Sequence, residues 1–168
     1  MMQIPASITR DALYFTNTKL QTELTEETMS ALLVTMARSP AYPEAKQALA
    51  KLQGQEGYSL YAFSNGEADR VSATLANADL LTILKEVISV ESVQSFKPDP
   101  RVYQHLCTCV DLPAHEVMLV SSNPFDIIGA SAFGIQTAWI KRSARVVFDE
   151  WETKPDYELT SLLDLVTL

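Results

Sequence analysis

Cysteine is scarce in this chain, with only Cys107 and Cys109 among 168 residues. The two lie two positions apart in a segment with helical periodicity, so their side chains should point about 200° away from each other. That geometry argues against a disulfide or a shared metal ion between them. So few cysteines are typical of a reducing compartment, and we expect a cytoplasmic protein.

Basic residues are also few, because 13 lysines and arginines stand against 21 aspartates and glutamates, for a net charge of -8. A nucleic-acid surface needs clustered lysine and arginine, and an anionic membrane surface attracts the same residues. We therefore expect neither partner. No apolar run approaches the roughly 18 residues of a membrane span, and residues 1–5 do not form a signal-peptide pattern.

Glycine and histidine are scarce too. The five glycines form neither a glycine-rich phosphate loop nor a Gly-x-Ser-x-Gly elbow, so these two kinds of site are not expected. The two histidines, His105 and His115, have no acid or serine near them in a catalytic arrangement. We interpret both as surface residues.

What the chain does contain, from residue 43 onward, is a regular alternation of short apolar runs with helix-like segments. Strands are predicted at residues 58–63, 87–90, 117–121 and 136–140. This alternation is typical of an α/β fold with a doubly wound parallel sheet. The first part of the chain predicts two helices with apolar stripes, so we divide the chain into a helical lobe, residues 1–40, and an α/β core, residues 41–168.

Two places in the chain carry polar residues that could bind a ligand. One is the end of a predicted strand, and the other is a constrained loop. Ser64 and Asn65 come directly after the strand at 58–63, where a hydroxyl, an amide and free helix N–H groups could hold an anion. They could equally cap the following helix. Lys97 stands between a phenylalanine and a proline, so it could neutralise a carboxylate or phosphate, or it could be an exposed loop lysine.

A third group of polar residues follows the strand at 117–121, and it contains Ser121, Asn123 and Asp126. Asp126 could bind a cation, orient a water molecule or cap the next helix. A Mg²⁺ ion held with substrate phosphate usually needs two nearby carboxylates, and here asparagine and proline stand where the second acid would be expected. We therefore predict no metal and no other cofactor.

Three segments in order resemble the haloacid dehalogenase superfamily, and most of all its 2-haloacid dehalogenase branch. They are Ser-Asn-Gly at 64–66, Lys-Pro-Asp-Pro-Arg-Val-Tyr at 97–103 and Ser-Ser-Asn-Pro-Phe-Asp at 121–126. Residues 8–13 and 24–28 look like the last helices of the family's cap. The resemblance implies a Rossmann-like parallel core with a remnant helical cap before it.

The resemblance also implies roles for individual residues. Family members form a covalent ester through an aspartate at the end of the first, central strand, and water then hydrolyses it. Lys97 would stabilise that aspartate, and Asn123 with Asp126 would place the water. Ser64 and Asn65 would bind substrate or leaving group. Tyr103 and Ser121 also fall on active-site positions of the family.

The family's first strand, with its nucleophilic aspartate, has no counterpart that we can identify in this sequence. The segment Arg-Asp-Ala-Leu-Tyr-Phe-Thr at 10–16 superficially resembles the segment around that nucleophile, with Asp11 as the aspartate. No apolar strand precedes Asp11, however, and its surroundings match a cap helix better. The strands at 58–63 and 117–121 would then lack the neighbour between them. Either they pair directly, or residues 2–4 fill the place, or another chain covers it. The last alternative predicts a homo-oligomer.

Three functions stay open at this point. The first is a degenerate dehalogenase-like protein that keeps a pocket for a small organic acid and binds it, or acts on it without hydrolysis through Lys97, Asp126 or Tyr103. The second is an active 2-haloacid hydrolase. The third is a non-catalytic oligomerisation module. Without a nucleophile the covalent route cannot proceed in the usual way, so we favour the first.

Overall fold

The computed structural model describes residues 5–149 and 151–168. Its helices are α1 Pro5–Leu20, α2 Glu26–Ala37, α3 Ala45–Gln53, α4 Ala68–Asn77, α5 Pro100–Val110 and α6 Pro124–Phe133. Its strands are β1 Tyr61–Ser64, β2 Glu86–Ser89, β3 Met118–Ser121, β4 Gln136–Ile140 and β5 Tyr157–Leu159. Strands and helices alternate from α3 to α6, as predicted, and all pairings are parallel. No helix of the described residues is long and apolar enough to cross a membrane.

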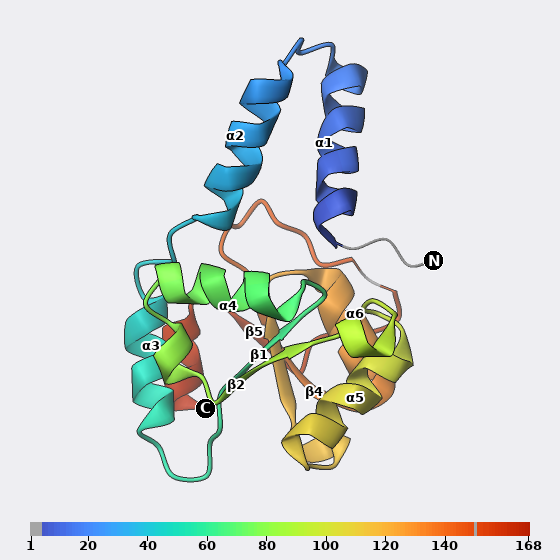
Figure 1. Cartoon of the computed structure of the whole chain (residues 1–168). Coiled ribbons are helices and arrows are strands. Elements are labelled where there is room, and N and C mark those ends of the chain that lie inside the picture. Colours follow the sequence, from blue (N-terminus) through green and yellow to red (C-terminus); the bar gives the residue numbers. More distant parts are fainter. Residues whose placement is uncertain (1–4, 150) are drawn as a thin grey trace.

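Helices α1 and α2 form a hairpin that projects from the strands (Figure 1). Thr25 caps α2 by accepting a hydrogen bond from the Thr28 N–H at 3.2 Å. The negative charges of two glutamates in the first turn also stabilise the helix, because they lie at the positive end of its dipole. The hairpin accounts for most of the predicted lobe at 1–40, although the boundary itself stays a prediction.

The apolar stripes predicted for these two helices are largely uncovered. Met29 is buried, but Phe15, Leu20 and Met36 are 65%, 63% and 57% exposed. For α2, whose stripe we expected to be buried, the expectation is confirmed at Met29 and wrong at Leu32 and Met36. The physical reason is that the hairpin stands away from the sheets, so no described element packs on its outer apolar surface (Figure 1).

The strands form two separate sheets. One contains β1 and β2, and the other has the order β3, β4 and β5. The single doubly wound sheet of the prediction is therefore divided, and β1 and β3 do not pair directly. Residues 2–4, which could have filled the place between them, lie outside the described residues. The α/β elements occur as expected, so the structure differs from this prediction only in that the sheet is not continuous.

The main core lies between α5, α6 and the sheets. It is built around buried side chains of Val90, Val102, Leu106, Leu119 and Ala130. Gly134 ends α6 with φ +95°, a left-handed conformation that suits glycine best. A smaller cluster joins α3 to the short 3-10 helices at 81–83 and 162–167. The core therefore holds α5 and α6 against the strand ends where the predicted site residues lie.

Helix α5 begins with Asp99 as N-cap and proline at its first position, where the missing N–H of proline is not needed. The Asp99 carboxylate accepts from the Arg101 N–H at 2.9 Å and also pairs with the Arg101 guanidinium. The Arg101 hydrogen bonds, first those of the side chain and then that of the backbone, hold the pKa of Asp99 well below its ordinary value.

This cap gives a pH-dependent test. A carboxyl whose pKa is depressed by folding stabilises the protein above its unfolded pKa near 4, and that contribution is lost as the pH falls. Asp99→Asn keeps a capping oxygen but removes the charge, so we expect a lower urea midpoint than wild type at about pH 7 and a smaller difference at about pH 3. Circular dichroism at both values checks this, and a difference independent of pH would contradict it.

Candidate active site

The predicted site residues converge where β1, the loop before α5 and the turn from β3 to α6 meet. The Lys97 Nζ lies 3.1 Å from Asp126 Oδ2, and the Ser121 hydroxyl donates to the same oxygen at 3.0 Å. The Lys97 backbone N–H donates to Asn65 Oδ1 at 2.9 Å. One lysine therefore connects the ends of both sheets.

The Lys97–Asp126 pair is largely removed from water, with side chains 9% and 15% exposed. Burying two charges is costly unless they contact each other and further polar groups satisfy them. Ser121 supplies such a group, and the Lys97 ammonium also lies 5.1 Å from the centre of the Phe63 ring. The exposed-lysine interpretation of Lys97 is therefore wrong, because the loop holds it inward.

Asp126 lies in the first turn of α6, where the partial positive charge of the helix end stabilises a carboxylate. The lysine, the hydroxyl and the helix end together make Asp126 a restrained anion. Such a group can orient a water molecule or a ligand hydroxyl. Its negative charge is already compensated, which makes it a poor nucleophile.

Tyr103 is completely buried beneath this pair. Its hydroxyl donates to the Asp126 backbone carbonyl at 3.4 Å, and its ring packs on Phe63 and Phe133. Burial, and then the charge of Asp126, raise the pKa of the Tyr103 phenol further above its ordinary value. The phenol therefore stays protonated, which suits a positioning residue better than the acid or base we considered.

Asn123 is the N-cap of α6, whereas Ser64 holds the turn that follows β1. The Gly66 N–H donates to the Ser64 hydroxyl oxygen at 3.0 Å, and the Phe125 N–H donates to Asn123 Oδ1 at 3.1 Å. The capping alternative for Ser64 and Asn65 is therefore wrong, because the N-cap of α4 is Glu67 and the Asn65 amide oxygen accepts from Lys97 instead. These contacts do not exclude ligand binding, because the Ser64 hydroxyl and the Asn123 amide still carry hydrogens that they can donate.

Two further residues support the site, and the sequence analysis did not select them. The Ser89 hydroxyl, at the end of β2, donates to the Gly66 carbonyl at 2.7 Å. The Trp139 indole donates to the Ser122 carbonyl at 3.1 Å, which fixes the turn between β3 and α6. Ser89 could have been found as a serine in the predicted strand at 87–90, whereas no local signal marks the Trp139 contact.

Other candidates lie away from this cluster. Asp11 is an exposed residue of α1 in the projecting hairpin. Cys107 and Cys109 are both free thiols, as expected, with Cys107 buried and Cys109 exposed. Among residues 5–149 and 151–168, no group of three or more histidines, cysteines, aspartates or glutamates could hold a metal ion.

Residues 7–134, which include Asn65, Lys97, Ser121 and Asp126, match a family model described as haloacid dehalogenase-like hydrolase. The chain belongs to this family. Within it, the chain is 36% identical over 160 residues to an (S)-2-haloacid dehalogenase of Pseudomonas sp. strain YL, and this match covers 95% of the chain and 68% of the relative. A haloacetate dehalogenase of Moraxella sp. strain B is 31% identical over 160 residues, covering 95% of the chain and 70% of the relative.

The fold is shared with the solved L-2-haloacid dehalogenase of Xanthobacter autotrophicus, with a TM-score of 0.89 and 28% sequence identity. That likeness covers 99% of this chain and 76% of the solved one. Together these matches place the chain in the 2-haloacid dehalogenase branch of the haloacid dehalogenase superfamily. The predicted family is therefore confirmed, and about 70% of a dehalogenase chain is represented.

Proposed function

We propose that this dehalogenase-like chain binds a small organic acid, without hydrolysing it, at the site formed by Lys97 and its neighbours Asn65, Ser121 and Asp126. The observation that carries the proposal is the pairing of Lys97 with Asp126 and Ser121. A buried lysine with neighbouring hydroxyl and amide donors suits a carboxylate or halide ligand. The donors are the Lys97 ammonium, the Ser64 hydroxyl and the Asn65 amide, supplied by one strand end and one loop, while the Ser121 hydroxyl donates to Asp126.

Hydrolysis would need a free carboxylate that faces Lys97. Among residues 5–149 and 151–168, Asp126 is the carboxylate paired with Lys97, and its charge is already compensated by three contacts. We propose that the family's nucleophile, with the central strand that carries it, does not form part of this site. In the same proposal α1 and α2 are the remnant of the family's helical cap.

The proposal is tested with (S)-2-chloropropionate, the type of compound that the names of the relatives suggest. We expect saturable binding by calorimetry, no chloride release, and at least tenfold weaker binding for Lys97→Met, since each charge-assisted hydrogen bond contributes about 1.5–3 kcal/mol. The exposed Lys46, which pairs with Asp79 on the surface, provides the control substitution Lys46→Met.

A second function is favoured by the relatives themselves, which are named as dehalogenases at 31–36% identity. If this chain hydrolyses haloacids, chloride is released from (S)-2-chloropropionate and the release is lost in Lys97→Met. That result would overturn binding without hydrolysis. Failure to bind this compound, together with a stable oligomer in sedimentation, would instead favour the oligomerisation module.

A further inference from the structure

One face of α5 carries a thiol and an imidazole side by side. His105 and Cys109 are four residues apart, so both side chains lie on the same face of the helix. The Cys109 Sγ lies 3.6 Å from His105 Nε2 and 3.8 Å from His105 Nδ1. Either ring nitrogen is therefore near enough to act together with the sulfur on one bound ion.

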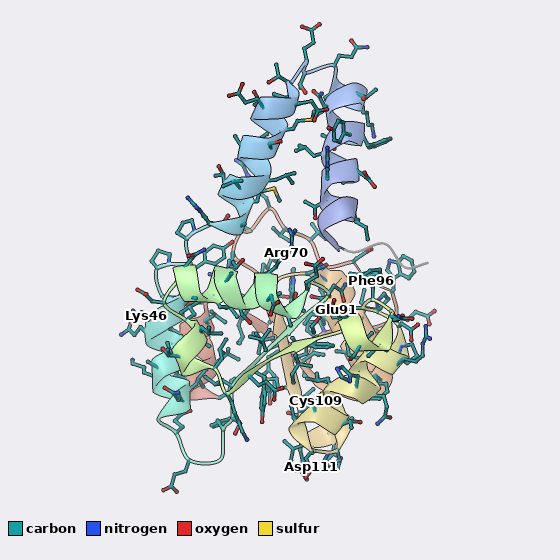
Figure 2. The ribbon with its side chains drawn as sticks, viewed as in Figure 1. Lys46, Arg70, Glu91, Phe96, Cys109 and Asp111 are labelled. Atoms are coloured by element: carbon teal, nitrogen blue, oxygen red, sulfur yellow. The ribbon has the colours of Figure 1, made fainter. Side chains whose placement is uncertain are left out.

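This pair is accessible from solvent and lies away from the ligand site at Lys97. Cys109 is an exposed free thiol, and His105 is half-buried. Cys109 lies near the end of α5 that is far from the α1–α2 hairpin (Figure 2). It comes nine positions after Pro100, where α5 begins beside the Lys97 loop, which corresponds to about 14 Å along the helix axis. The pair is therefore a separate feature of the surface.

Two further groups act on the pair. The Ser92 hydroxyl lies 3.4 Å from the same His105 Nε2, which places a polar oxygen beside the imidazole. The negative charge of Glu86, at the start of β2, acts on Cys109 and favours a positive ion there. Partial burial, and then this charge, raise the pKa of the Cys109 thiol. A thiol that stays protonated is a weak nucleophile, which argues against a role in thiol exchange.

The separation of sulfur and nitrogen matches two ligands of a tetrahedral zinc ion. A Zn–S bond of about 2.3 Å and a Zn–N bond of about 2.1 Å, at an angle of about 109°, place the two ligand atoms about 3.6 Å apart. The distance from Cys109 Sγ to His105 Nε2 is 3.6 Å. In metalloproteases, two histidines four residues apart on one helix face hold zinc in the same way. The helix therefore presents the two ligands at the spacing that the ion needs.

We propose that His105 and Cys109 form a two-ligand binding site for Zn²⁺ on the surface of α5. The ion bonds the thiolate sulfur and the imidazole nitrogen, water completes the tetrahedron, and the thiol proton is released to solvent. Two protein ligands are fewer than the three or four of permanent zinc sites, so the ion exchanges readily. We expected no metal from the sequence, but the structure joins a cysteine to a histidine. The site is independent of the proposed function, because Lys97 and its neighbours take no part in it.

The test is a titration of the full chain with Co²⁺, which takes the place of zinc and, unlike zinc, gives an absorption spectrum. A bond from cobalt to a thiolate adds a charge-transfer absorption in the near ultraviolet. We expect this absorption to saturate at one Co²⁺ per chain and to disappear when Zn²⁺ is added, because thiolate ligands select zinc. Cys109→Ser should abolish it. His105→Gln should weaken Co²⁺ binding at least about tenfold, since even the outer partners of a metal site contribute that much.

Two matched variants separate this site from other groups of the same kind. Cys107→Ala removes the buried thiol, and His115→Gln removes an exposed imidazole that pairs with Glu116. Neither should alter the absorption. The proposal is overturned if excess Co²⁺ gives no thiolate absorption, which would leave the pair as a hydrogen bond only, or if His105→Gln binds Co²⁺ as tightly as wild type. Saturation at one Co²⁺ per two chains would also overturn it, because the ligands would then come from two molecules.

Discussion

Gly129→Ala is expected to lower the free energy of unfolding by about 2 kcal/mol. A Cβ at this position in α6 would overlap the Tyr103 hydroxyl and lie 2.6 Å from Pro98 Cβ. Tyr103 is completely buried and cannot rotate away. Overpacking of this kind costs about 3 kcal/mol, and the better helix propensity of alanine offsets about 1 kcal/mol. Urea denaturation followed by circular dichroism measures the difference.

Gly54→Ala is the matched control for this substitution. Gly54 has φ -79°, and a Cβ added there would meet its nearest atom at 3.5 Å. We expect no loss of stability, or a gain of up to about 1 kcal/mol from reduced freedom of the unfolded chain. Because Pro98 follows Lys97, Gly129→Ala should also weaken ligand binding at the site, whereas Gly54→Ala should not. Equal stabilities for the two variants would show that α5 and α6 are not closely packed.

Lys97→Met is expected to lower the free energy of unfolding by about 3 kcal/mol. Removing one partner from a buried ion pair costs about 3–5 kcal/mol, and the lower part of that range applies because Ser121 still donates to Asp126. Methionine keeps the length of the side chain, so the loss reports charge rather than volume. The measurement is the urea midpoint at neutral pH.

Two comparisons separate this effect from a general surface effect. Lys46 lies on α3, away from the site (Figure 2), and Lys46→Met breaks its exposed pair with Asp79. We expect the free energy of unfolding to change by about 0.5 kcal/mol or less. The double variant Lys97→Met with Asp126→Asn removes the uncompensated charge and should regain part of the stability. If Lys97→Met were no more harmful than Lys46→Met, the pair would not be buried in solution.

Local chemistry sets several of the helix boundaries. Thr25 at the start of α2, Asp99 followed by proline at the start of α5, and Gly134 at the end of α6 each act within a few residues. Capping depends on neighbours in the chain, so it can be inferred without a fold. The strand at 136–140 was likewise predicted by its continuous apolar run and is observed with the same bounds.

Long-range packing explains what the sequence could not predict. The apolar stripes of α1 and α2 indicate which surface favours burial, but not whether another element covers it, and Phe15 and Met36 are exposed. Similarly, the order of strand ends placed Lys97 and Asp126 in one site, but only the fold shows that they pair directly. Tyr103 was selected as a site residue, and its burial beneath Asp126 could not be foreseen from its position in a helix.

By itself the sequence determined the α/β class, the family and the set of polar residues at the strand ends, because these follow from periodicity and from motifs in order. The tertiary structure decided that the Asp126 carboxylate is compensated by Lys97 and Ser121, and that the sheet is divided between β1 and β3. Both depend on contacts between segments distant in the chain. A carboxylate becomes a ligand-orienting group or a nucleophile through its neighbours, and a strand becomes an edge or a central strand through the presence of a partner.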